Sequence, residues 1–469
     1  MAKDMRSYME ELKHRGEILT LAEQFDVDAG IGQYLFAQRD KAVLFGNVAG
    51  YPKWNVLGQA PANMRHIGIA FDCDYRNVVK EFARRIAEGL RTCRIIDDGP
   101  VKETIMKDDQ VDVLSLPSHV IGEKDPGRYI ASGLCITKDP DTGIRNMAMH
   151  RLQVKEKDKL GIYMVEGKHT WTIYEKYKSM GEAMPIAVVI GHHPMYYFAA
   201  AYSGNYILDE LEVAGSLLGE TVDLVKCETV NLEVPAYGEI VLECEALPDI
   251  EEEEGPFAEF TDYYGSRMKR PVLRIKAMTA RHDCIYKAVQ SSAHSESIFY
   301  NSIPMAAAIY RDLQNVGGRA DISDVSCSWG STFNVVVQMK PRFFGEAKQV
   351  LLAAVSSVYS HQKVAIAVDE DVDIYDPQDV AWAIATRVNP EVDISVVSGV
   401  RGHPLDNSLP EVDDPAVEPW HRVGSRCVID ATKPPTSDLH GRGMFDRVRP
   451  PSGEGPVTVT SDSAPQRGV

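Results

Sequence analysis

TVNLEVPAYGEIVLECEA, residues 229–246, is the longest of several short runs rich in β-branched and aliphatic residues. The other runs are ASGLCITKD (131–139), NMAMHRLQV (146–154), PIAVVIG (185–191) and VLRIKAMTA (272–280). Glycine, proline and charged residues separate them, as is typical of short strands joined by turns. Many separate strands in one stretch favour a barrel-like or sandwich sheet over a doubly wound one. We therefore predict a β-rich central domain over residues 116–305, interrupted by a helical pattern at 208–220.

Before this region the sequence predicts a small α/β unit. Residues 5–15 and 77–90 place apolar side chains at helical spacing. Between them, KAVLFGNVAGYP (41–52) is typical of a strand closed by a turn. We take residues 1–115 as this N-terminal unit.

After the central region the pattern alternates between helix and strand. Helical patterns at 302–318, 345–360 and 376–388 flank strand patterns at 333–339 and 364–375. Asp376 and Pro377 have the residue types of an N-cap and a first helical position. This order predicts a C-terminal α/β domain over 306–435. Residues 436–469 are rich in proline, glycine and serine, which predicts a flexible tail. The expected fold class is therefore mixed α/β (α+β).

Charge and cysteine usage limit the function classes. The 469 residues include 50 Lys and Arg against 68 Asp and Glu, a net charge of −18, which disfavours nucleic-acid binding. An anionic small substrate then needs local cations in its site. The eight cysteines are scattered without a CxxC pair, which indicates reduced thiols rather than disulfides or a zinc site. No stretch approaches the roughly 18 apolar residues of a membrane span, so we expect a cytoplasmic protein with no membrane association.

The most unusual segment is EEEEGPFAEF, residues 251–260. It can be a solvated acidic loop. However, Gly255-Pro256 restricts the backbone to a turn, and the aromatic residues after it are expected to be buried. A carboxylate beside buried aromatic rings loses hydration, so its pKa rises toward the range useful for proton transfer. Paired carboxylates at such a turn suit acid–base chemistry near neutrality.

A second candidate segment is RNMAMHR, residues 145–151. On a strand, Asn146, Ala148 and His150 share one face, and Arg151 lies on the other unless a bulge intervenes. The segment can be an ordinary edge strand, but the planar guanidinium of Arg151 suits a carboxylate. Asn, His and Glu donors together suit Mn²⁺ or Mg²⁺. The spacing of these residues does not by itself bring them together, so the residues indicate an acid–base enzyme with a candidate metal.

Taken in order, several motifs resemble the UbiD family of decarboxylases over residues 5–435. They are LVKCET (224–229), LEVPA (232–236), EIVLE (239–243), EGPF (254–257), WAIATR (382–387) and DAT (430–432). Each motif is weak alone, but their order and spacing together are specific. The resemblance implies an N-terminal α/β unit, a central split β-barrel that binds a flavin, and a C-terminal α/β oligomerisation domain.

The resemblance also implies site residues, position by position. Arg151, Glu254 and Glu259 match the family's catalytic arginine and its two catalytic acids. The metal-binding residues match Asn146, His169 and Glu210. The cofactor-binding residues implied are Asn146, Met147, Arg151, Lys168, His169, Ala201 and Glu210.

The implied activity is prenylated-FMN-dependent, reversible decarboxylation of an aromatic, heteroaromatic or α,β-unsaturated carboxylic acid. It proceeds by adduct formation with the cofactor, loss of CO₂ and protonation, with Glu259 as the expected proton donor. The implied cofactors are prenylated FMN, Mn²⁺ (or Mg²⁺) and K⁺. The implied partners are the small-molecule acid, a flavin prenyltransferase that supplies the cofactor, and further copies of the chain in a homodimer or homohexamer.

Two positions depart from the family's pattern. Residues 199–204, AAAYSG, stand where relatives have a serine-containing stretch that contacts the cofactor. In some relatives a lysine binds the cofactor phosphate, and its position in the alignment falls near Ser357 of this chain. Lys168, where relatives often have glutamine, is our candidate replacement for that charge. The expected substrate-lining residues, by analogy, are His294, Ser295, Glu296, Phe299, His403 and Leu405.

Three other functions stay open at this point. The same fold can run as a carboxylase or as one subunit of a carboxylase, or it can be a non-catalytic paralogue. Retention of Arg151, Glu254 and Glu259 together argues against the paralogue. A metal-dependent hydrolase is disfavoured because the chain has no HExxH motif.

Overall fold

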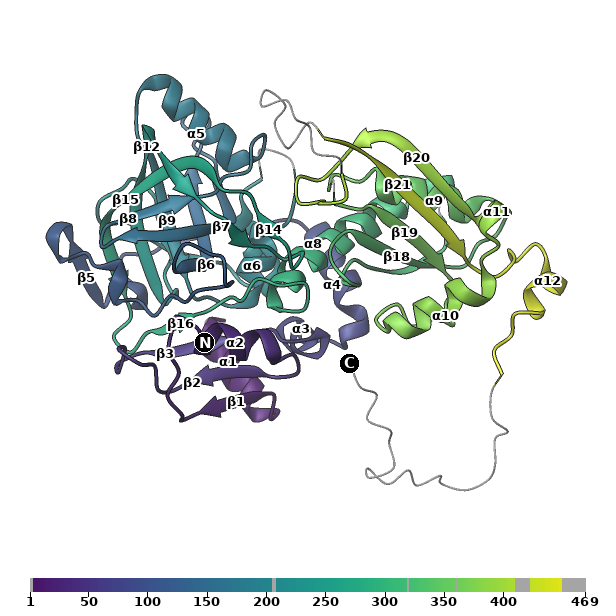
Figure 1. Cartoon of the computed structure of the whole chain (residues 1–469), viewed down its shortest axis with the longest axis horizontal. Helices are drawn as coiled ribbons and strands as arrows, with labels where there is room; N and C mark the ends of the chain where they lie inside the picture. The colour runs from purple at the N-terminus through teal and green to yellow at the C-terminus, as the bar shows by residue number, and fades with distance from the viewer. Residues whose placement is uncertain (1–2, 205–207, 319, 360, 410–421, 449–469) are drawn as a thin grey trace.

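The computed structural model describes residues 3–204, 208–318, 320–359, 361–409 and 422–448. Figure 1 shows two lobes, with the β-barrel and the N-terminal unit on one side and the C-terminal α/β domain on the other. Helices α4 and α8 lie between the lobes. The mixed α/β class predicted from the sequence is confirmed.

The N-terminal unit is a four-stranded sheet in the order β1-β2-β3-β16, within the described residues. Its last strand arrives from the end of the barrel, and it pairs in parallel with β3. The strands are β1 (Ile18–Leu21), β2 (Ala42–Phe45), β3 (Asn55–Gly58) and β16 (Ile285–Lys287). The helices are α1 (Met5–His14), α2 (Gly30–Ala37), α3 (Met64–Phe71) and α4 (Val78–Ala87), with the 3₁₀ turn η1 (Tyr75–Asn77) before α4. Both helices predicted in this part of the chain are present.

The central domain is a closed barrel of six strands in the described part of the chain. The order is β12-β9-β6-β7-β8-β15, and pairing of β15 with β12 closes the ring. The strands are β6 (Tyr129–Lys138), β7 (Arg145–Glu156), β8 (Lys159–Ile162), β9 (Met184–Ile190), β12 (Ile240–Glu254) and β15 (Met268–Ala280). Closure leaves no free edge, which explains why aliphatic residues recur along every strand.

Short elements surround the barrel. Strand β5 (Thr104–Lys107) extends β15, and β4 (Arg94–Ile95), β10 (Asp223–Lys226) and β11 (Glu233–Pro235) form a separate small sheet. The hairpin β13 (Phe257–Ala258) and β14 (Tyr264–Gly265) follows β12. The helices are α5 (His169–Met180), α6 (Pro194–Ala200) and α7 (Glu210–Leu218), with 3₁₀ turns η2 (Pro100–Lys102), η3 (Asp108–Gln110) and η4 (Val113–Ser115).

The C-terminal domain is a mixed sheet in the order β17-β18-β19-β21-β20. Its strands are β17 (Ile322–Ser326), β18 (Asn334–Met339), β19 (Val364–Val368), β20 (Ile394–Arg401) and β21 (Val423–Ala431). Its helices are α8 (Glu296–Leu313), α9 (Glu346–Val355), α10 (Pro377–Arg387), α11 (Pro390–Asp393) and α12 (Leu439–Gly443), with η5 (Val316–Gly318) after α8. The predicted cap of α10 is confirmed, because the Asp376 side chain accepts a hydrogen bond from the Gln378 N–H at 2.9 Å.

The structure refines the predicted boundaries. Helix α8 begins at Glu296 rather than at 302, so it spans the predicted boundary at 305. Residues 285–287 lie in the range predicted for the central domain, but they form a strand that pairs in the N-terminal sheet. Residues 104–107 lie in the range predicted for the N-terminal unit, but they form a strand that pairs with the barrel. Pairing across sequence-distant segments is a tertiary choice that local pattern does not show.

Residues 436–448 of the predicted flexible tail lie within the described part of the chain. Residues 436–448 carry α12, and Arg442 and Arg447 form ion pairs with Asp369 and Asp379 of the C-terminal domain. These pairs hold a proline- and glycine-rich stretch that local composition assigns to a flexible tail. Residues 449–469 lie outside the described part of the chain. Among the described helices, none combines the length and the apolar character that a membrane crossing needs.

Candidate active site

One cavity of about 490 Å³ lies between the barrel and the C-terminal domain. Strand β7 and the start of α5 line one side of it. The end of α6, the residues after it and helix α8 line a second side, and loops of the C-terminal domain close a third. The cavity wall includes eight of the predicted site residues: Asn146, Met147, Arg151, Lys168, His169, Ala201, Glu210 and Glu259. The residues that the sequence suggested separately are therefore brought to one place.

Arg151 joins both predicted acids. Its Nε and Nη2 donate to the two carboxylate oxygens of Glu254 at 2.9 and 2.7 Å, and its Nη1 donates to Glu259. The side chains of Arg151, Glu254 and Glu259 are 8%, 0% and 11% exposed. A bidentate pair of this kind fixes the plane of a guanidinium. Glu254 lies behind Arg151 and is absent from the cavity wall, so it acts on the site through the arginine.

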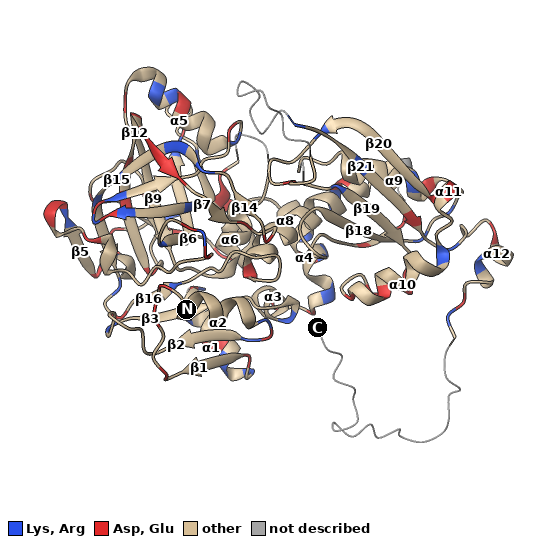
Figure 2. Cartoon of the chain, viewed as in Figure 1, with Lys and Arg blue, Asp and Glu red and all other residues tan. Residues whose placement is uncertain are grey.

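The turn after β12 sets this geometry. Figure 2 shows the acidic run as the red end of β12, with Glu254 at its last position. Gly255 has φ 81°, and a Cβ there would lie 2.9 Å from the Ser266 carbonyl oxygen, so the turn requires glycine. The β13–β14 hairpin then returns Glu259 to Arg151, and its loop is closed by the Glu259 N–H donating to the Tyr263 carbonyl at 2.9 Å.

Two aromatic rings cover the guanidinium. The Arg151 Cζ lies 4.2 Å from the Tyr163 ring centroid and 4.8 Å from that of Phe257. These faces stabilise the cation and exclude water from it. Burial raises the pKa of Glu259; Arg151 opposes the rise, and the neighbouring Glu254 and Asp125 add to it. Burial by itself would lower the pKa of Arg151, but Glu259 and Glu254 raise it, so the guanidinium stays charged. The expectation that burial raises the pKa of an acid beside the aromatic run is met at Glu259.

The alternation predicted along β7 is present. Asn146 Nδ2 and His150 Nε2 both lie 3.0 Å from the Thr170 hydroxyl, so the two residues share a face. Arg151 lines the same cavity as Asn146 and His150. The β6–β7 register shifts between Ile130 and Gly133, so the ladder is irregular beside Arg151. The bulge considered from sequence is therefore on the partner strand.

The three candidate metal ligands come from separate elements. Asn146 is on β7, His169 begins α5 and Glu210 begins α7. Glu210 Oε2 accepts the Met147 N–H at 2.8 Å, which ties the start of α7 to β7. Burial raises the pKa of Glu210 to about 8, since a backbone N–H alone compensates its charge poorly. A buried carboxylate, an imidazole and an amide on the wall of one cavity suit a cation, so the chemistry of these residues fits a divalent metal.

Among the described residues, no group of three or more His, Cys, Asp or Glu side chains is placed to hold a metal ion. The candidate ligands Asn146, His169 and Glu210 include only one histidine and one glutamate, and their third member is an asparagine. They are therefore not a group of three His, Cys, Asp or Glu side chains.

Lys168 lines the cavity and forms no ion pair with a described residue. Burial of its ammonium lowers the pKa of Lys168, and Arg401 adds to this effect. Ala201 and the residues after it, up to Gly204, also line the cavity. Ser357 does not, and its hydroxyl bonds Tyr359 and Gln362 instead.

Comparison with known proteins identifies the family. Residues 94–293 match the model of the 3-octaprenyl-4-hydroxybenzoate carboxy-lyase Rift-related domain, and residues 299–431 match that of the corresponding C-terminal domain. The chain belongs to the UbiD family. It is a carboxy-lyase by family, and the resemblance inferred from the sequence motifs is confirmed.

Relatives of this UbiD-family chain include named decarboxylases. An anhydromevalonate phosphate decarboxylase of Methanothermobacter thermautotrophicus is 33% identical over 342 residues, 72% of this chain and 76% of the relative. A phenolic acid decarboxylase of Bacillus subtilis is 28% identical over 456 residues, 94% of each chain. The UbiD-class enzyme HmfF from Pelotomaculum thermopropionicum, solved with FMN, has a TM-score of 0.86 and 31% identity. That comparison covers 96% of this chain and 97% of HmfF.

The predicted substrate-lining residues divide into two groups. His403 and Leu405 line the cavity of this UbiD-family chain, whereas His294, Ser295, Glu296 and Phe299 are not part of its wall. Glu296 is instead paired with Lys287 in a fully buried cluster. Helix α8 begins at Glu296 and faces the cavity through Ser297, Asn301 and Met305, which lie one turn apart.

Sequence reasoning missed several wall residues. Tyr163 and Thr170 contact the predicted residues directly, and His361 and Tyr359 come from the C-terminal domain. Asp125 was also missed; it accepts the Ala258 N–H at 3.0 Å and so anchors the β13 hairpin. Thr170 directly follows the predicted His169, which is the one signal that could have pointed to it.

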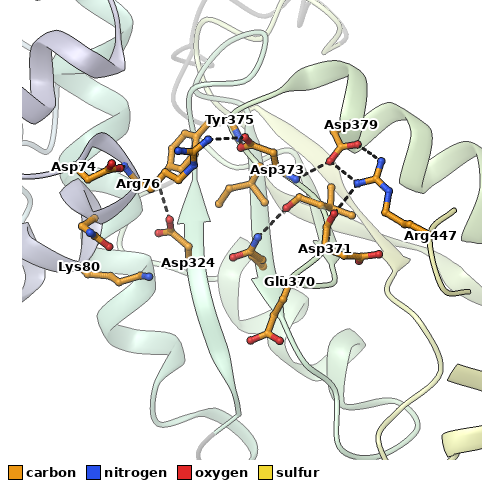
Figure 3. Close-up of a pocket in the computed structure, with 14 residues that line it drawn as sticks. Asp74, Arg76, Lys80, Asp324, Glu370, Asp371, Asp373, Tyr375, Asp379 and Arg447 are labelled. Carbon is orange, nitrogen blue, oxygen red and sulfur yellow. Dashed lines mark hydrogen bonds and ion pairs between the residues drawn. The ribbon is translucent and has the colours of Figure 1, made fainter. Parts of the chain in front are cut away.

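A larger pocket of about 700 Å³ lies between the N-terminal unit and the C-terminal domain (Figure 3). Its walls carry charged side chains, and Arg447 pairs with Asp379 at 2.6 Å and Arg76 with Asp373 at 3.6 Å. The Tyr375 hydroxyl donates a hydrogen bond to Asp324 at 2.9 Å. None of the residues predicted from the family pattern lines it. Size alone therefore does not mark the active site.

Proposed function

We propose that this chain is a prenylated-FMN-dependent decarboxylase. Its substrate is an aromatic, heteroaromatic or α,β-unsaturated carboxylic acid, and the reaction is reversible. The observation that carries the proposal is Arg151, buried between Glu254 and Glu259, on the wall of the cavity that also holds Asn146, His169 and Glu210. Support comes from HmfF, which was solved with FMN and, in an evolved dimeric form, with prenylated FMN.

The charge balance around Arg151 gives Glu259 its role. Glu254 already neutralises the guanidinium through two hydrogen bonds. A substrate carboxylate that approaches Arg151 would meet a second buried anion if Glu259 were ionised. Burial raises the pKa of Glu259 and favours its protonated form. In this proposal Glu259 takes up a proton when the substrate carboxylate binds, and it delivers this proton to the carbon that has lost CO₂.

The cofactor would be held by the same cavity. When bound, the prenylated flavin supplies the electron sink for the electrons left by CO₂. Asn146, His169 and Glu210 would hold Mn²⁺ or Mg²⁺, and the ion would supply positive charge that compensates the buried Glu210 and favours an anionic cofactor. Met147 and Ala201 line the same wall. K⁺ is a further proposed cation, and a flavin prenyltransferase is the proposed supplier of the cofactor.

Lys168 is proposed to replace the phosphate-gripping lysine of some relatives. It lines the cavity, whereas Ser357, near the relatives' lysine position, does not. A dianionic phosphate would give this ammonium a partner and oppose the lowering of its pKa. The C-terminal domain is proposed to assemble the chain into a homodimer or homohexamer.

One experiment tests the proposal. The protein is produced with and without a flavin prenyltransferase, its absorption spectrum is recorded, and cinnamic-type, hydroxybenzoic and heteroaromatic acids are screened for CO₂ release. We expect release only from the prenylated-flavin form. Glu259→Gln should abolish release while the cofactor stays bound. Glu253→Gln, on the same acidic run but 68% exposed, is the matched control and should turn over normally. Release without any flavin, or normal turnover in Glu259→Gln, overturns the proposal.

A further inference from the structure

Behind Asn146 lies a short chain of buried hydrogen bonds that the proposed reaction does not use. Asn146 Nδ2 contacts the Thr170 hydroxyl at 3.0 Å, and His150 Nε2 contacts the same hydroxyl at 3.0 Å. His150 Nδ1 lies 2.9 Å from the Tyr163 carbonyl oxygen. Asn146, His150 and Thr170 are 5%, 9% and 2% exposed, so water does not compete for these bonds.

The direction of each bond follows from the carbonyl at the end. A carbonyl oxygen only accepts, so His150 Nδ1 carries the proton and donates to Tyr163. In a neutral ring Nε2 then has the lone pair, and the Thr170 hydroxyl donates to it. The Thr170 hydroxyl has one proton, and it donates this proton to His150. Its oxygen can therefore only accept a hydrogen bond from Asn146. The Asn146 amide therefore presents its NH₂ to Thr170, and its Oδ1 points away from Thr170.

The opposite amide orientation is disfavoured by the same network. It would place Asn146 Oδ1 against Thr170, which would then donate its proton to the amide. His150 Nε2 would need a second ring proton to avoid a lone-pair contact, making the buried imidazole cationic. Burial lowers the pKa of His150 to about 4, so the ring is neutral near neutral pH. Bond direction, rather than atom position, decides which end of an amide faces a site.

We propose that His150 and Thr170 are positioning residues that orient the Asn146 amide so that its oxygen, not its nitrogen, is available to a divalent cation in the cavity. The inference rests on the cation site of the proposed function. An amide NH₂ cannot bind a metal ion, so an unfixed amide would be wrongly oriented part of the time. The same hydroxyl belongs to the second residue of α5, so it also holds the helix that begins at His169 against β7.

Thr170→Val removes the hydroxyl and keeps the shape, and Thr170→Ser keeps the hydroxyl. Outer-shell partners of metal ligands typically change metal affinity by about 10–100-fold, so we expect at least about a tenfold loss in Thr170→Val and near-normal affinity in Thr170→Ser. The matched control is Thr172→Val in the same helix, whose hydroxyl bonds only the Lys168 carbonyl. The measurement is Mn²⁺ titrated into the full-length protein with FMN present, with free Mn²⁺ counted by electron paramagnetic resonance. Urea unfolding confirms that each variant folds.

A second pair of variants separates the effect of the Thr170 hydroxyl on the orientation of the Asn146 amide from its effect on packing. In Asn146→Asp both side-chain oxygens are equivalent, so no orientation needs to be fixed. Adding Thr170→Val to this background should lower Mn²⁺ affinity by less than about threefold. An equal loss from Thr170→Val whether or not Asn146→Asp is present, or normal affinity in Thr170→Val, overturns the inference. If the unsubstituted protein binds no Mn²⁺, the cation site of the proposed function fails before any variant is compared, and this inference fails with it.

Discussion

The buried ion pair between Lys287 and Glu296 allows a quantitative prediction. The two side chains are 1% and 0% exposed and bond each other directly. The Glu296 carboxylate also accepts the N–H groups of Gln59 and Ala60 at 3.0 and 3.1 Å and the Tyr300 hydroxyl at 3.0 Å. One carboxylate thus joins the N-terminal sheet, β16 and α8. Glu296→Gln keeps its shape but removes the charge that Lys287 needs.

The loss in the free energy of unfolding caused by Glu296→Gln has an upper limit, which is the free energy needed to deprotonate Lys287. An unpaired buried ammonium can always discharge, and from its ordinary pKa of 10.5 this costs about 1.36 × 3.5, or about 5 kcal/mol, at pH 7. Breaking a buried pair typically costs about 3–5 kcal/mol, which agrees with this upper limit. In the variant the folded lysine is neutral while the unfolded lysine is charged. Raising the pH lowers the cost of releasing this proton on folding, so the loss of stability shrinks by about 1.4 kcal/mol per pH unit below the pKa of the unfolded lysine.

The assay is urea unfolding followed by tryptophan fluorescence at pH 7, 8 and 9. We expect Glu296→Gln to lose about 3–5 kcal/mol at pH 7 and to recover about 3 kcal/mol by pH 9 relative to the unsubstituted protein. In Lys287→Met the unpaired group is the Glu296 carboxylate, so the loss in the free energy of unfolding should grow as the pH rises. The exposed Glu182→Gln, the control, should stay within about 0.5 kcal/mol. A loss below about 1 kcal/mol at pH 7, or one that does not change with pH, refutes the reasoning.

Three further predictions concern the cavity. The decarboxylation rate, measured by CO₂ release, should fall as the pH rises through the raised pKa of Glu259, because the acid must be protonated to donate. Glu259→Gln should lower this rate by about 10²–10⁴-fold and should lack the fall with pH. Arg151→Lys should lose a charge-assisted bond to a buried carboxylate and about 1.5–3 kcal/mol in urea unfolding, and an unchanged unfolding midpoint would contradict the bidentate contact. Lys168→Gln should retain less flavin after gel filtration than Ser357→Ala does, and equal retention would count against the proposed phosphate contact.

Local signals in the sequence accounted for much of the site. The Glu-Gly-Pro turn predicted two acids close together, and Arg151 joins them. The period-two pattern of β7 correctly placed Asn146 and His150 on one face. The family resemblance predicted further cavity residues, among them Lys168, His169 and Glu210, which come from segments that sequence spacing could not connect.

Glu296 shows why local signals also misled. It follows His294 and Ser295 in a polar segment near the expected substrate pocket, and by analogy it was a lining residue. The structure shows that the Lys287 ammonium and two backbone N–H groups of the N-terminal unit neutralise it in the core. Whether a carboxylate faces a cavity or a buried lysine depends on the rotation of α8, and the sequence around it reads the same in both cases.

The sequence by itself determined the mixed α/β class, the order of the three parts and the turn that places Glu254 beside Glu259, because periodicity and glycine–proline chemistry act over a few residues. Only the tertiary structure decided that β16 joins the N-terminal sheet, that the register shift in β6 lies beside Arg151 and that Thr170 meets both Asn146 and His150. These contacts join residues that lie far apart in the chain or on neighbouring elements. They depend on strand register and chain path, which follow from the packing of the whole molecule.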